Sequence, residues 1–277
     1  MNNQRQLTHG TSALVIARNI RADIEAGRLA HGDQLPSTRE LATEWGTSVA
    51  TINRAMQQLA DEGLVINKAR SSRIVNYPQT KKPRSEPHRP VAILIGGYAG
   101  SGKTELGRIL ARSTSWPILD KDSTTRNVVE AALETLGQSP HDRESETYLQ
   151  VIRPAEYQAL NTTMFENLQC GVSAIVTAPF IREFSDQAWC DRLQAEIAAL
   201  GADCEAVWVR CDPTTMRTYL RHRGAARDTW KLAHWEEYLK GIDLHFEPRM
   251  PHTIIDNSES APPLQQQADE LLQRVLT

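Results

Sequence analysis

An apolar segment that runs straight into a glycine-rich loop constrains this chain more than any other feature. Residues 91–104 read VAILIGGYAGSGKT, in which residues 97–104 match the pattern G-x-x-x-x-G-K-[ST]. In this pattern a buried strand leads into a loop whose backbone N–H groups surround phosphate oxygens, and then into a helix with a positive N-terminal end. The sequence therefore predicts a phosphate-binding strand–loop–helix unit rather than a glycine-rich turn that only joins two elements.

The residues of this loop have distinct expected roles. The Lys103 ammonium is placed to reach the β- and γ-phosphates, and the Thr104 hydroxyl is placed to hold Mg²⁺. We therefore expect ATP or GTP, with magnesium, as the cofactors, and the sequence does not distinguish the two nucleotides. The predicted nucleotide-binding residues of the loop are Gly97, Ala99, Gly100, Ser101, Gly102, Lys103 and Thr104.

Composition indicates a soluble protein of two domains. A length of 277 residues suits two domains, and no apolar run approaches the ~20 residues that cross a membrane. The four cysteines form no C-x-x-C pair, which is typical of reduced thiols, so we expect a cytoplasmic protein with no membrane partner. Residues 1–90 hold 13 Lys and Arg against 8 Asp and Glu, whereas the remainder holds 18 against 26. The basic front part therefore favours a polyanionic partner.

The first 76 residues have the pattern of three short helices and a hairpin. One helix is expected over residues 12–25, and Ser37 and Glu40 form a capping box that starts a second helix running to residue 46. A third helix begins at residues 47–48 and ends before Gly63. Residues 64–66 and 74–75 then flank a polar stretch and form a hairpin, called the wing below. Two helices separated by a turn and followed by a wing predict a winged helix-turn-helix domain.

A proline-rich stretch separates this domain from the rest of the chain. Residues 76–90 hold four prolines and almost no apolar side chains, which is typical of an extended linker. We therefore predict a DNA-binding domain over residues 1–76, a basic linker over 77–90 and a nucleotide-binding domain over 91–277. In the last of these, alternating patterns predict a parallel sheet with helices on both faces. Strands are expected at 91–95, 117–119, 172–176, 204–210 and 253–255, and helices at 103–111, 126–136, 155–170, 187–200, 214–222, 230–239 and 264–275.

Residues 34–65 resemble the DNA-binding domain of GntR-type transcription regulators. The stretch Gln34-Leu-Pro-Ser-Thr-Arg-Glu-Leu-Ala and the later Leu-Ala-Asp-Glu-Gly-Leu-Val65 carry the resemblance. It implies a homodimer on double-stranded operator DNA, with the third helix in the major groove. The wing departs from the family because a glycine pair is absent from its tip. The alternative is a small helical bundle that contacts protein, or a wing that no longer binds. The expected DNA contacts are Arg39, Ser48, Val49, Thr51, Asn53, Arg54, Lys68, Arg70 and Arg73.

The C-terminal domain looks like a small P-loop kinase. It is similar to the group that contains gluconate kinase, adenylylsulfate kinase, chloramphenicol phosphotransferase and zeta toxins. Beyond the loop, the resemblance depends on residues 119–123, Leu-Asp-Lys-Asp-Ser, at the end of the second strand. It implies that Asp122 accepts the proton of an acceptor hydroxyl and that Asp120 orients Mg²⁺ through water or positions the acceptor. The alternative is an acidic turn that caps the following helix.

A second region, residues 217–228, resembles the arginine-bearing lid of these kinases. The resemblance implies that Arg223 and Arg227 neutralise the transferring phosphoryl group, with Arg221 behind them on the nucleotide, while Lys103 completes the catalytic set. The alternative is a solvated helix face with ordinary surface arginines. The middle strand, residues 172–176, ends in Thr177 without the acidic residue by which mechanical ATPases hold Mg²⁺. This absence favours a phosphoryl-transfer fold, or a sensor derived from one.

Three functions follow from these patterns. The leading hypothesis is a sequence-specific transcription regulator whose P-loop domain binds a nucleotide with magnesium and senses an effector. The second is an active small-molecule kinase, which transfers a phosphoryl group to a hydroxyl acceptor and carries its own autoregulatory DNA-binding domain. The third is an interaction module in which neither site works. The sequence does not identify the operator, the effector or the acceptor.

Overall fold

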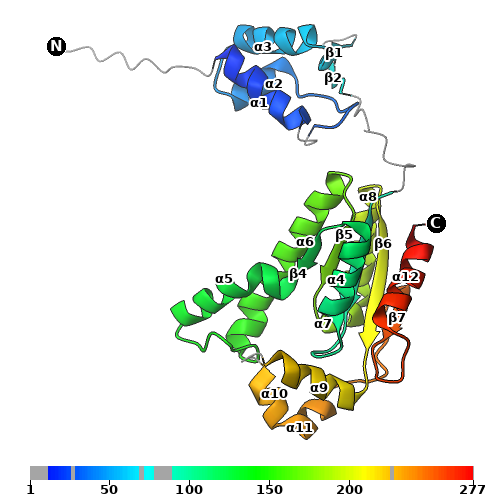
Figure 1. The fold of residues 1–277 in the computed structure, drawn as a ribbon. Coiled ribbons are helices and arrows are strands. Elements are labelled where there is room, and N and C mark those ends of the chain that lie inside the picture. The colour runs from blue at the N-terminus through cyan, green and yellow to red at the C-terminus, as the bar shows by residue number, and fades with distance from the viewer. Residues whose placement is uncertain (1–11, 26–28, 69–71, 78–88, 225–227, 277) are drawn as a thin grey trace, which may run out of the picture. The chain divides into compact units, whose positions relative to one another are not determined.

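The computed structural model describes residues 12–25, 29–68, 72–77, 89–224 and 228–276. The chain divides into two compact units, Met1–Glu86 and Pro87–Thr277, and each is described by itself (Figure 1). Most of the predicted linker, including residues 78–88, lies outside the described residues. No helix in the described part of the chain is both long and apolar enough to cross a membrane.

The described residues of the N-terminal unit form three helices and a two-stranded hairpin, as the sequence predicts. Helices α1 (Ala13–Glu25), α2 (Thr38–Glu44) and α3 (Val49–Asp61) precede the antiparallel strands β1 (Val65–Asn67) and β2 (Arg73–Val75). The capping box forms, because the Ser37 hydroxyl accepts the Glu40 N–H at 3.3 Å and the Glu40 carboxylate accepts the Ser37 N–H at 2.7 Å. Hydrogen bonding of the Glu40 carboxylate to the Ser37 side chain and to the Ser37 N–H lowers the pKa of Glu40. The core of the unit consists of Ile16, Ala17, Ile20, Ile24, Leu35, Leu41, Ala42, Ile52, Ala55, Met56, Leu59, Val65 and Val75.

The C-terminal unit is built on a sheet of five parallel strands. Strand order is β4-β5-β3-β6-β7, so β3, which leads into the phosphate loop, lies at the centre and is buried along its whole length. In this order the loops that follow neighbouring strands all open at the carboxyl edge of the sheet, where ligands bind in open parallel sheets. The strands are β3 (Val91–Gly96), β4 (Ile118–Asp120), β5 (Ala174–Thr177), β6 (Asp203–Arg210) and β7 (His252–Asp256).

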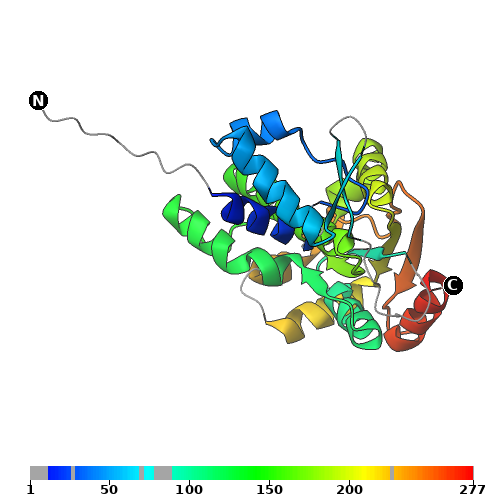
Figure 2. The same ribbon diagram turned by 90° about the horizontal axis from the view of Figure 1, so that it is seen from above.

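Helices cover both faces of this sheet (Figures 1 and 2). On one face, Leu106 of α4 and Leu271 of α12 pack against a core that includes Ile93. On the other, Leu160 of α6 and Leu193 of α8 belong to a second core. The helices are α4 (Lys103–Thr114), α5 (Lys121–Thr135), α6 (Arg153–Gln169), α7 (Ile181–Ser185), α8 (Gln187–Ala199), α9 (Pro213–Arg223), α10 (Thr229–Ala233), α11 (Trp235–Lys240) and α12 (Leu264–Val275).

Four local features differ from the sequence expectations. Helix α5 begins at Lys121 rather than at residue 126, because the Asp120 carboxylate caps it by accepting the Ser123 N–H at 2.9 Å. The predicted helix over 230–239 is interrupted at His234, which has φ −117° and ψ 48°, and becomes α10 and α11. A π-helical segment at Tyr148–Ile152 and the short helix α7 were not predicted.

Candidate nucleotide and DNA sites

The phosphate loop, residues 97–104, is held between α9 and the residue that follows β7. Gly100 has a φ of 83°, and a Cβ there would lie 2.8 Å from the Met216 carbonyl oxygen. Gly102 has a φ of 97°, and a Cβ there would overlap the side chain of Asn257, whose Nδ2 donates to the Ser101 carbonyl oxygen at 3.0 Å. Only glycine combines these conformations with so close an approach. The loop therefore forms a cradle that a larger residue would fill.

Three other residues of the loop, Gly97, Ser101 and Ala99, differ in their surroundings. The Gly97 N–H donates to the Pro179 carbonyl oxygen at 3.1 Å, so this glycine anchors the loop to the segment after β5. The Ser101 hydroxyl is buried and has no hydrogen-bond partner among the described residues. Ala99 lines a cavity described below. An unpartnered buried hydroxyl beside a glycine cradle fits a polar ligand such as a phosphate group.

Lys103, Thr104 and Asp120 bring a cation, a hydroxyl and a carboxylate together. The Lys103 ammonium donates to the Tyr98 carbonyl oxygen at 2.7 Å. The Thr104 hydroxyl donates to Asp120 Oδ2 at 3.1 Å, and the Thr177 hydroxyl donates to the same oxygen at 2.6 Å. The carboxylate that is absent from the end of β5 thus comes from the end of the neighbouring strand β4. Oxygen donors of this kind suit Mg²⁺, which keeps several of its waters in nucleotide sites.

Two cavities meet at this cluster. The first, here called the loop cavity, has a volume of about 500 Å³ and is also lined by Arg126, Tyr219 and Asn257. The second, here called the tyrosine cavity, has a volume of about 540 Å³ and extends between α6 and the segment after α9. The tyrosine cavity takes its name from Tyr98, Tyr148, Tyr157 and Tyr238. Four residues line both cavities: Lys103, Thr104, Asp120 and Asp122.

Asp122 lies in the first turn of α5, beside a buried network of charges. The Lys121 ammonium lies 2.8 Å from Glu156 Oε1 and 3.3 Å from Asp122 Oδ1. Glu156 also accepts hydrogen bonds from the Thr125 and Tyr148 hydroxyls, both at 2.7 Å. Burial raises the pKa of Tyr148, so its hydroxyl stays protonated and donates. This network fixes the start of α5 against α6 and the π-helical segment, and therefore fixes Asp122 at the junction of the two cavities.

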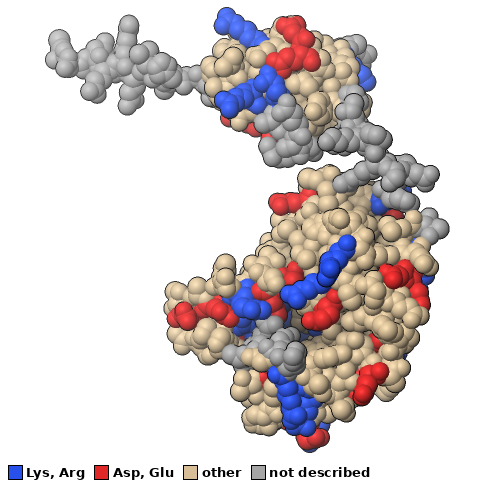
Figure 3. Space-filling view, in the orientation of Figure 1, with Lys and Arg blue, Asp and Glu red and all other residues tan. Residues whose placement is uncertain are grey.

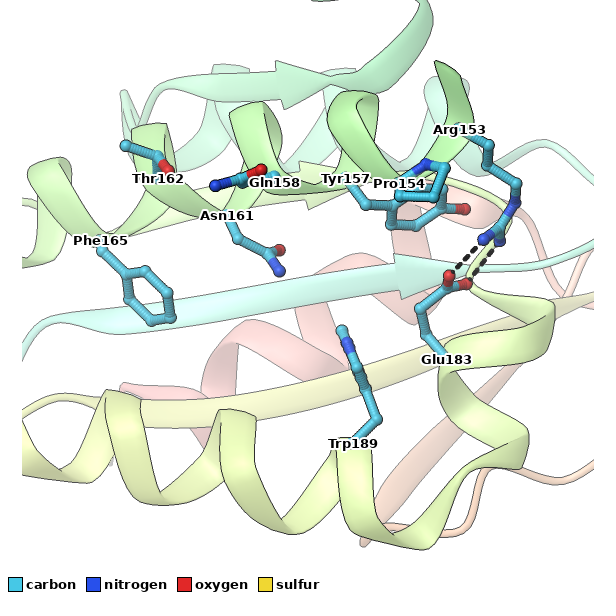
Figure 4. A pocket seen from close by; sticks show the side chains of 9 residues that line it. All are labelled: Arg153, Pro154, Tyr157, Gln158, Asn161, Thr162, Phe165, Glu183 and Trp189. Carbon is cyan, nitrogen blue, oxygen red and sulfur yellow. Dashed lines mark hydrogen bonds and ion pairs between the residues drawn. The ribbon is translucent and has the colours of Figure 1, made fainter. Parts of the chain in front are cut away.

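Arg153 and Glu183 form a two-point ion pair between α6 and α7 (Figure 4). The two guanidinium–carboxylate distances are 2.7 Å and 2.8 Å, and the guanidinium lies 4.3 Å from the centre of the Tyr157 ring. Burial alone would lower the pKa of Arg153, but the hydrogen bonds to Glu183 raise it. Figure 4 shows a third pocket of about 450 Å³ beside this pair, with Phe165 and Trp189 further along it. Arg153 and Tyr157 line both this pocket and the tyrosine cavity.

The predicted lid is only partly described. Arg221 is exposed on α9 and is absent from the linings of the loop and tyrosine cavities. The side chain of Arg223 and the whole of Arg227 lie outside the described residues. Three residues that follow the gap, Asp228, Trp230 and Lys231, line the tyrosine cavity.

Helix α3 presents a polar face in the N-terminal unit. One face is apolar and buried, with Ile52 and Met56 on it, whereas Asn53 and Arg54 are exposed and Val49, in the first turn, is 45% exposed. Ser48 caps the helix by accepting the Thr51 N–H at 3.1 Å, and the two hydroxyls lie 2.9 Å apart.

The other predicted DNA contacts lie on α2 and the wing. Arg39 on α2 and Lys68 on the wing are exposed, and Arg70 lies outside the described residues. Arg73 is half-buried and is bonded within the unit to Thr38 and Asn53. On the face drawn in Figure 3, acidic and basic side chains of the C-terminal unit are interspersed, so charge alone marks no DNA surface there.

Several residues of these sites were not predicted as site residues. Thr177 could have been found from its position directly after an apolar run, which marks the carboxyl end of a buried strand. Glu156 and Asn257 have no such local signal, because they reach their partners across 35 and 156 residues.

Two family models match the chain. The model described as "Bacterial regulatory proteins, gntR family" matches residues 13–75, and that described as "AAA domain" matches residues 92–245. The chain is 38% identical over 60 residues to the uncharacterized HTH-type transcriptional regulator YdeL of Bacillus subtilis (strain 168), and 37% identical over 68 residues to YjiR of Escherichia coli (strain K12). These matches cover 22% and 24% of this chain, but 13% and 14% of the length of the curated relatives.

Solved structures show the fold of the larger unit. A candidate kinase from Chloroflexus aurantiacus superposes with a TM-score of 0.50 at 20% identity, over 67% of this chain and 98% of that chain. At this identity the similarity shows a shared fold alone. Together with the second family model, which matches more than half of the chain, the comparisons confirm both resemblances. The chain belongs to the AAA domain family (AAA_33), and a DNA-binding domain of the gntR family of bacterial regulatory proteins precedes that domain in the sequence.

Proposed function

We propose that this chain is a sequence-specific transcription regulator whose P-loop domain binds ATP or GTP with Mg²⁺ and senses an effector. The observation that carries the proposal is the convergence of Lys103, Thr104 and Asp120 beside the glycine cradle, in a chain that also presents the polar face of α3. The cluster of Lys103, Thr104 and Asp120 suits a nucleoside triphosphate with bound magnesium, and the polar face of α3 suits the major groove of DNA.

Different residues of the P-loop domain would bind different parts of the magnesium–nucleotide ligand. Lys103 would bind the β- and γ-phosphates, and Thr104 would hold Mg²⁺, with Asp120 acting through water. The bound nucleotide supplies a phosphoryl group whose negative charge the metal neutralises. Asn257 would keep the loop in its open conformation, because its amide already satisfies the Ser101 carbonyl oxygen.

Regulation requires that the liganded and empty chains differ in their affinity for DNA. GntR-type domains bind paired half-sites, which implies a homodimer. A ligand that changes the geometry of this dimer changes the distance between its two DNA-binding domains, and therefore how well they match the spacing of the half-sites. A coupling of about 1–3 kcal/mol would change operator affinity by roughly 5- to 150-fold. Sedimentation of the full chain tests the dimer, and a single monomeric species at micromolar concentration would contradict it.

The decisive experiment measures operator affinity with and without Mg²⁺ and nucleotide. The operator affinity of the wild-type protein should change by at least fivefold when Mg²⁺ and nucleotide are added. Lys103→Ala should bind the operator with the affinity of the nucleotide-free wild type, and added nucleotide should not change that affinity. Glu166→Gln, an exposed change on α6, is the matched control and should behave as wild type. Equal wild-type affinities at saturating nucleotide would refute the sensor function.

A second function, an active small-molecule kinase, is favoured by the tyrosine cavity. This cavity begins at the cluster around Lys103 and extends away from the loop cavity, as a site for an acceptor would. Asp122 would accept the proton of an acceptor hydroxyl while the hydroxyl oxygen bonds to the γ-phosphorus and the bond to the β-phosphate breaks. Arg223 and Arg227 would neutralise the phosphoryl group in transit.

This second function has its own test. Release of ADP should depend on an added acceptor, and Asp122→Asn should lower turnover by about 10²- to 10⁴-fold while nucleotide affinity is unchanged. If no sugar, antibiotic or nucleoside in a broad screen raises turnover, the kinase function fails and the sensor function stands.

A further inference from the structure

We propose that Arg73 is a positioning residue, which orients the base-reading side chain of Asn53, and that it is not a contact to DNA phosphate. The proposal rests on the proposed DNA-binding function and refines it. The sequence predicts a phosphate contact for Arg73, since it is one of the basic residues of the wing. Its hydrogen bonds within the unit indicate another role.

The Arg73 guanidinium joins three elements of the N-terminal unit. Its Nη1 donates to the Thr38 hydroxyl at 2.7 Å, and its Nη2 donates to Asn53 Oδ1 at 3.1 Å. Arg73 is the first residue of β2, Thr38 is the first residue of α2, and Asn53 lies on the exposed face of α3. One side chain of the wing therefore ties the recognition helix to the helix before it.

The bond to Oδ1 fixes which way the Asn53 carboxamide points. An asparagine that reads a base edge must present its oxygen and its nitrogen in a set order, for example to N6 and N7 of adenine. An exposed carboxamide in water adopts either orientation, so part of its selectivity would be lost. The charged donor of Arg73 holds the oxygen toward the wing and leaves Nδ2 turned away. Because a carbonyl oxygen has two lone pairs, Oδ1 keeps one for a base.

The same geometry makes Arg73 a poor phosphate contact. Each terminal nitrogen of its guanidinium already uses one of its two N–H groups inside the unit, and turning both nitrogens toward a phosphate would break these bonds and leave Asn53 unsupported. Lys68 lies on the same wing and is exposed, and its side chain has no hydrogen bond or ion pair to any residue that the structure describes, although its backbone N–H donates to the Ser72 carbonyl oxygen. It is therefore the matched cation for comparison.

The test uses the full chain and two readouts that separate the two roles. A preferred operator is first selected from random duplexes with wild-type protein. Affinities of wild type, Arg73→Met, Asn53→Ala, the double variant and Lys68→Met are then measured over a series of salt concentrations and single base-pair changes. A phosphate contact sets the slope of log affinity against log salt, at about 0.9 per phosphate, whereas a base contact sets the preference at one base pair.

We expect Arg73→Met to lower the preference at one base pair by about tenfold and to leave the salt slope unchanged. Asn53→Ala should remove the preference at the same base pair. The double variant should lose no more of this preference than Asn53→Ala alone. Lys68→Met should reduce the slope by about 0.9 and keep every preference. If Arg73→Met instead weakens all sequences equally and reduces the slope, Arg73 is a phosphate contact and the proposal is wrong.

One more variant, Thr38→Val, keeps the proposal testable if Arg73→Met does not fold. Thr38→Val removes only the acceptor of Nη1, and should weaken the same base-pair preference by a smaller factor. If Arg73→Met unfolds and Thr38→Val leaves the preference unchanged, the proposal is also overturned. If the wild-type chain selects no sequence at all, the proposed DNA-binding function fails, which is a separate outcome.

Discussion

Removing the Glu156 carboxylate should destabilise the C-terminal unit more than most single substitutions. This side chain is 4% exposed and accepts hydrogen bonds from Lys121, Thr125 and Tyr148. Glu156→Ala would leave Lys121, whose side chain is 6% exposed, with Asp122 at 3.3 Å as its remaining carboxylate within 4 Å among the described residues. Breaking one side of a buried ion pair costs about 3–5 kcal/mol.

Tryptophan fluorescence during urea unfolding measures this loss. Five of the six tryptophans lie in the C-terminal unit, so the signal reports mainly on that unit. For a unit of this size, a loss of 3–5 kcal/mol lowers the melting temperature by roughly 6–20 °C. Glu166→Ala, an exposed change on the same helix, should stay within about 0.5 kcal/mol of wild type.

A double variant tests the physical reason for the loss. Because the damage comes from a buried cation that has lost its buried carboxylate partner and keeps only the more exposed Asp122, replacing both Lys121 and Glu156 with apolar residues should restore part of the stability. Lys121→Met with Glu156→Leu should therefore be more stable than Glu156→Ala. A loss below about 1 kcal/mol for Glu156→Ala, or a double variant less stable than the single one, would refute this account of the network.

Three further predictions concern a helix cap, a thiol and the loop. Asp212→Ala should cost about 1 kcal/mol at pH 7, because the Asp212 carboxylate caps α9, and the hydrogen bonds it accepts, chiefly from Thr215, lower its pKa. This contribution to the free energy of unfolding should be present above the ordinary pKa of an aspartate and should disappear as the pH falls through the lowered pKa of the folded state. An equal loss of unfolding free energy at pH 2 and at pH 7, measured by urea unfolding, would contradict this prediction. Iodoacetamide at pH 8 should modify one exposed thiol, Cys170, because burial raises the pKa of the thiols of Cys190, Cys204 and Cys211. Mass spectrometry of the treated protein should therefore find no adduct in Cys170→Ser. Gly102→Ala should lose about 1–3 kcal/mol from its φ of 97° and should abolish thermal stabilisation by Mg²⁺ and nucleotide, whereas a retained shift would show that the loop adapts.

Local patterns were sufficient to predict most of the elements. The capping box at Ser37, the apolar face of α3 and the run before the phosphate loop each depend on residues within one turn or one strand. The start of α5 was misplaced because Asp120 serves both the strand and the helix cap, and the sequence alone favoured a later start.

Contacts between distant segments could not be read from the sequence in this way. The Asp120–Thr177 bond joins residues 57 apart, and the bonds of Arg73 to Thr38 and of Lys121 to Glu156 each join residues 35 apart. Such pairs arise only when the sheet order and helix packing are known. For the same reason the tyrosine cavity, whose lining comes from several separate segments, was not predicted.

The position of Asp120 and Asp122 at the start of one helix has a mechanical consequence. A displacement of α5 would move the Asp122 carboxylate away from the cavity junction, whereas Asp120, the last residue of β4, would stay beside Thr177 in the sheet. The phosphate loop would be unaffected, because Asn257 clamps it from the opposite side of the sheet. A shift of this one helix would therefore abolish the proposed phosphoryl transfer and leave the proposed nucleotide site in place, with no change in the sequence of the loop.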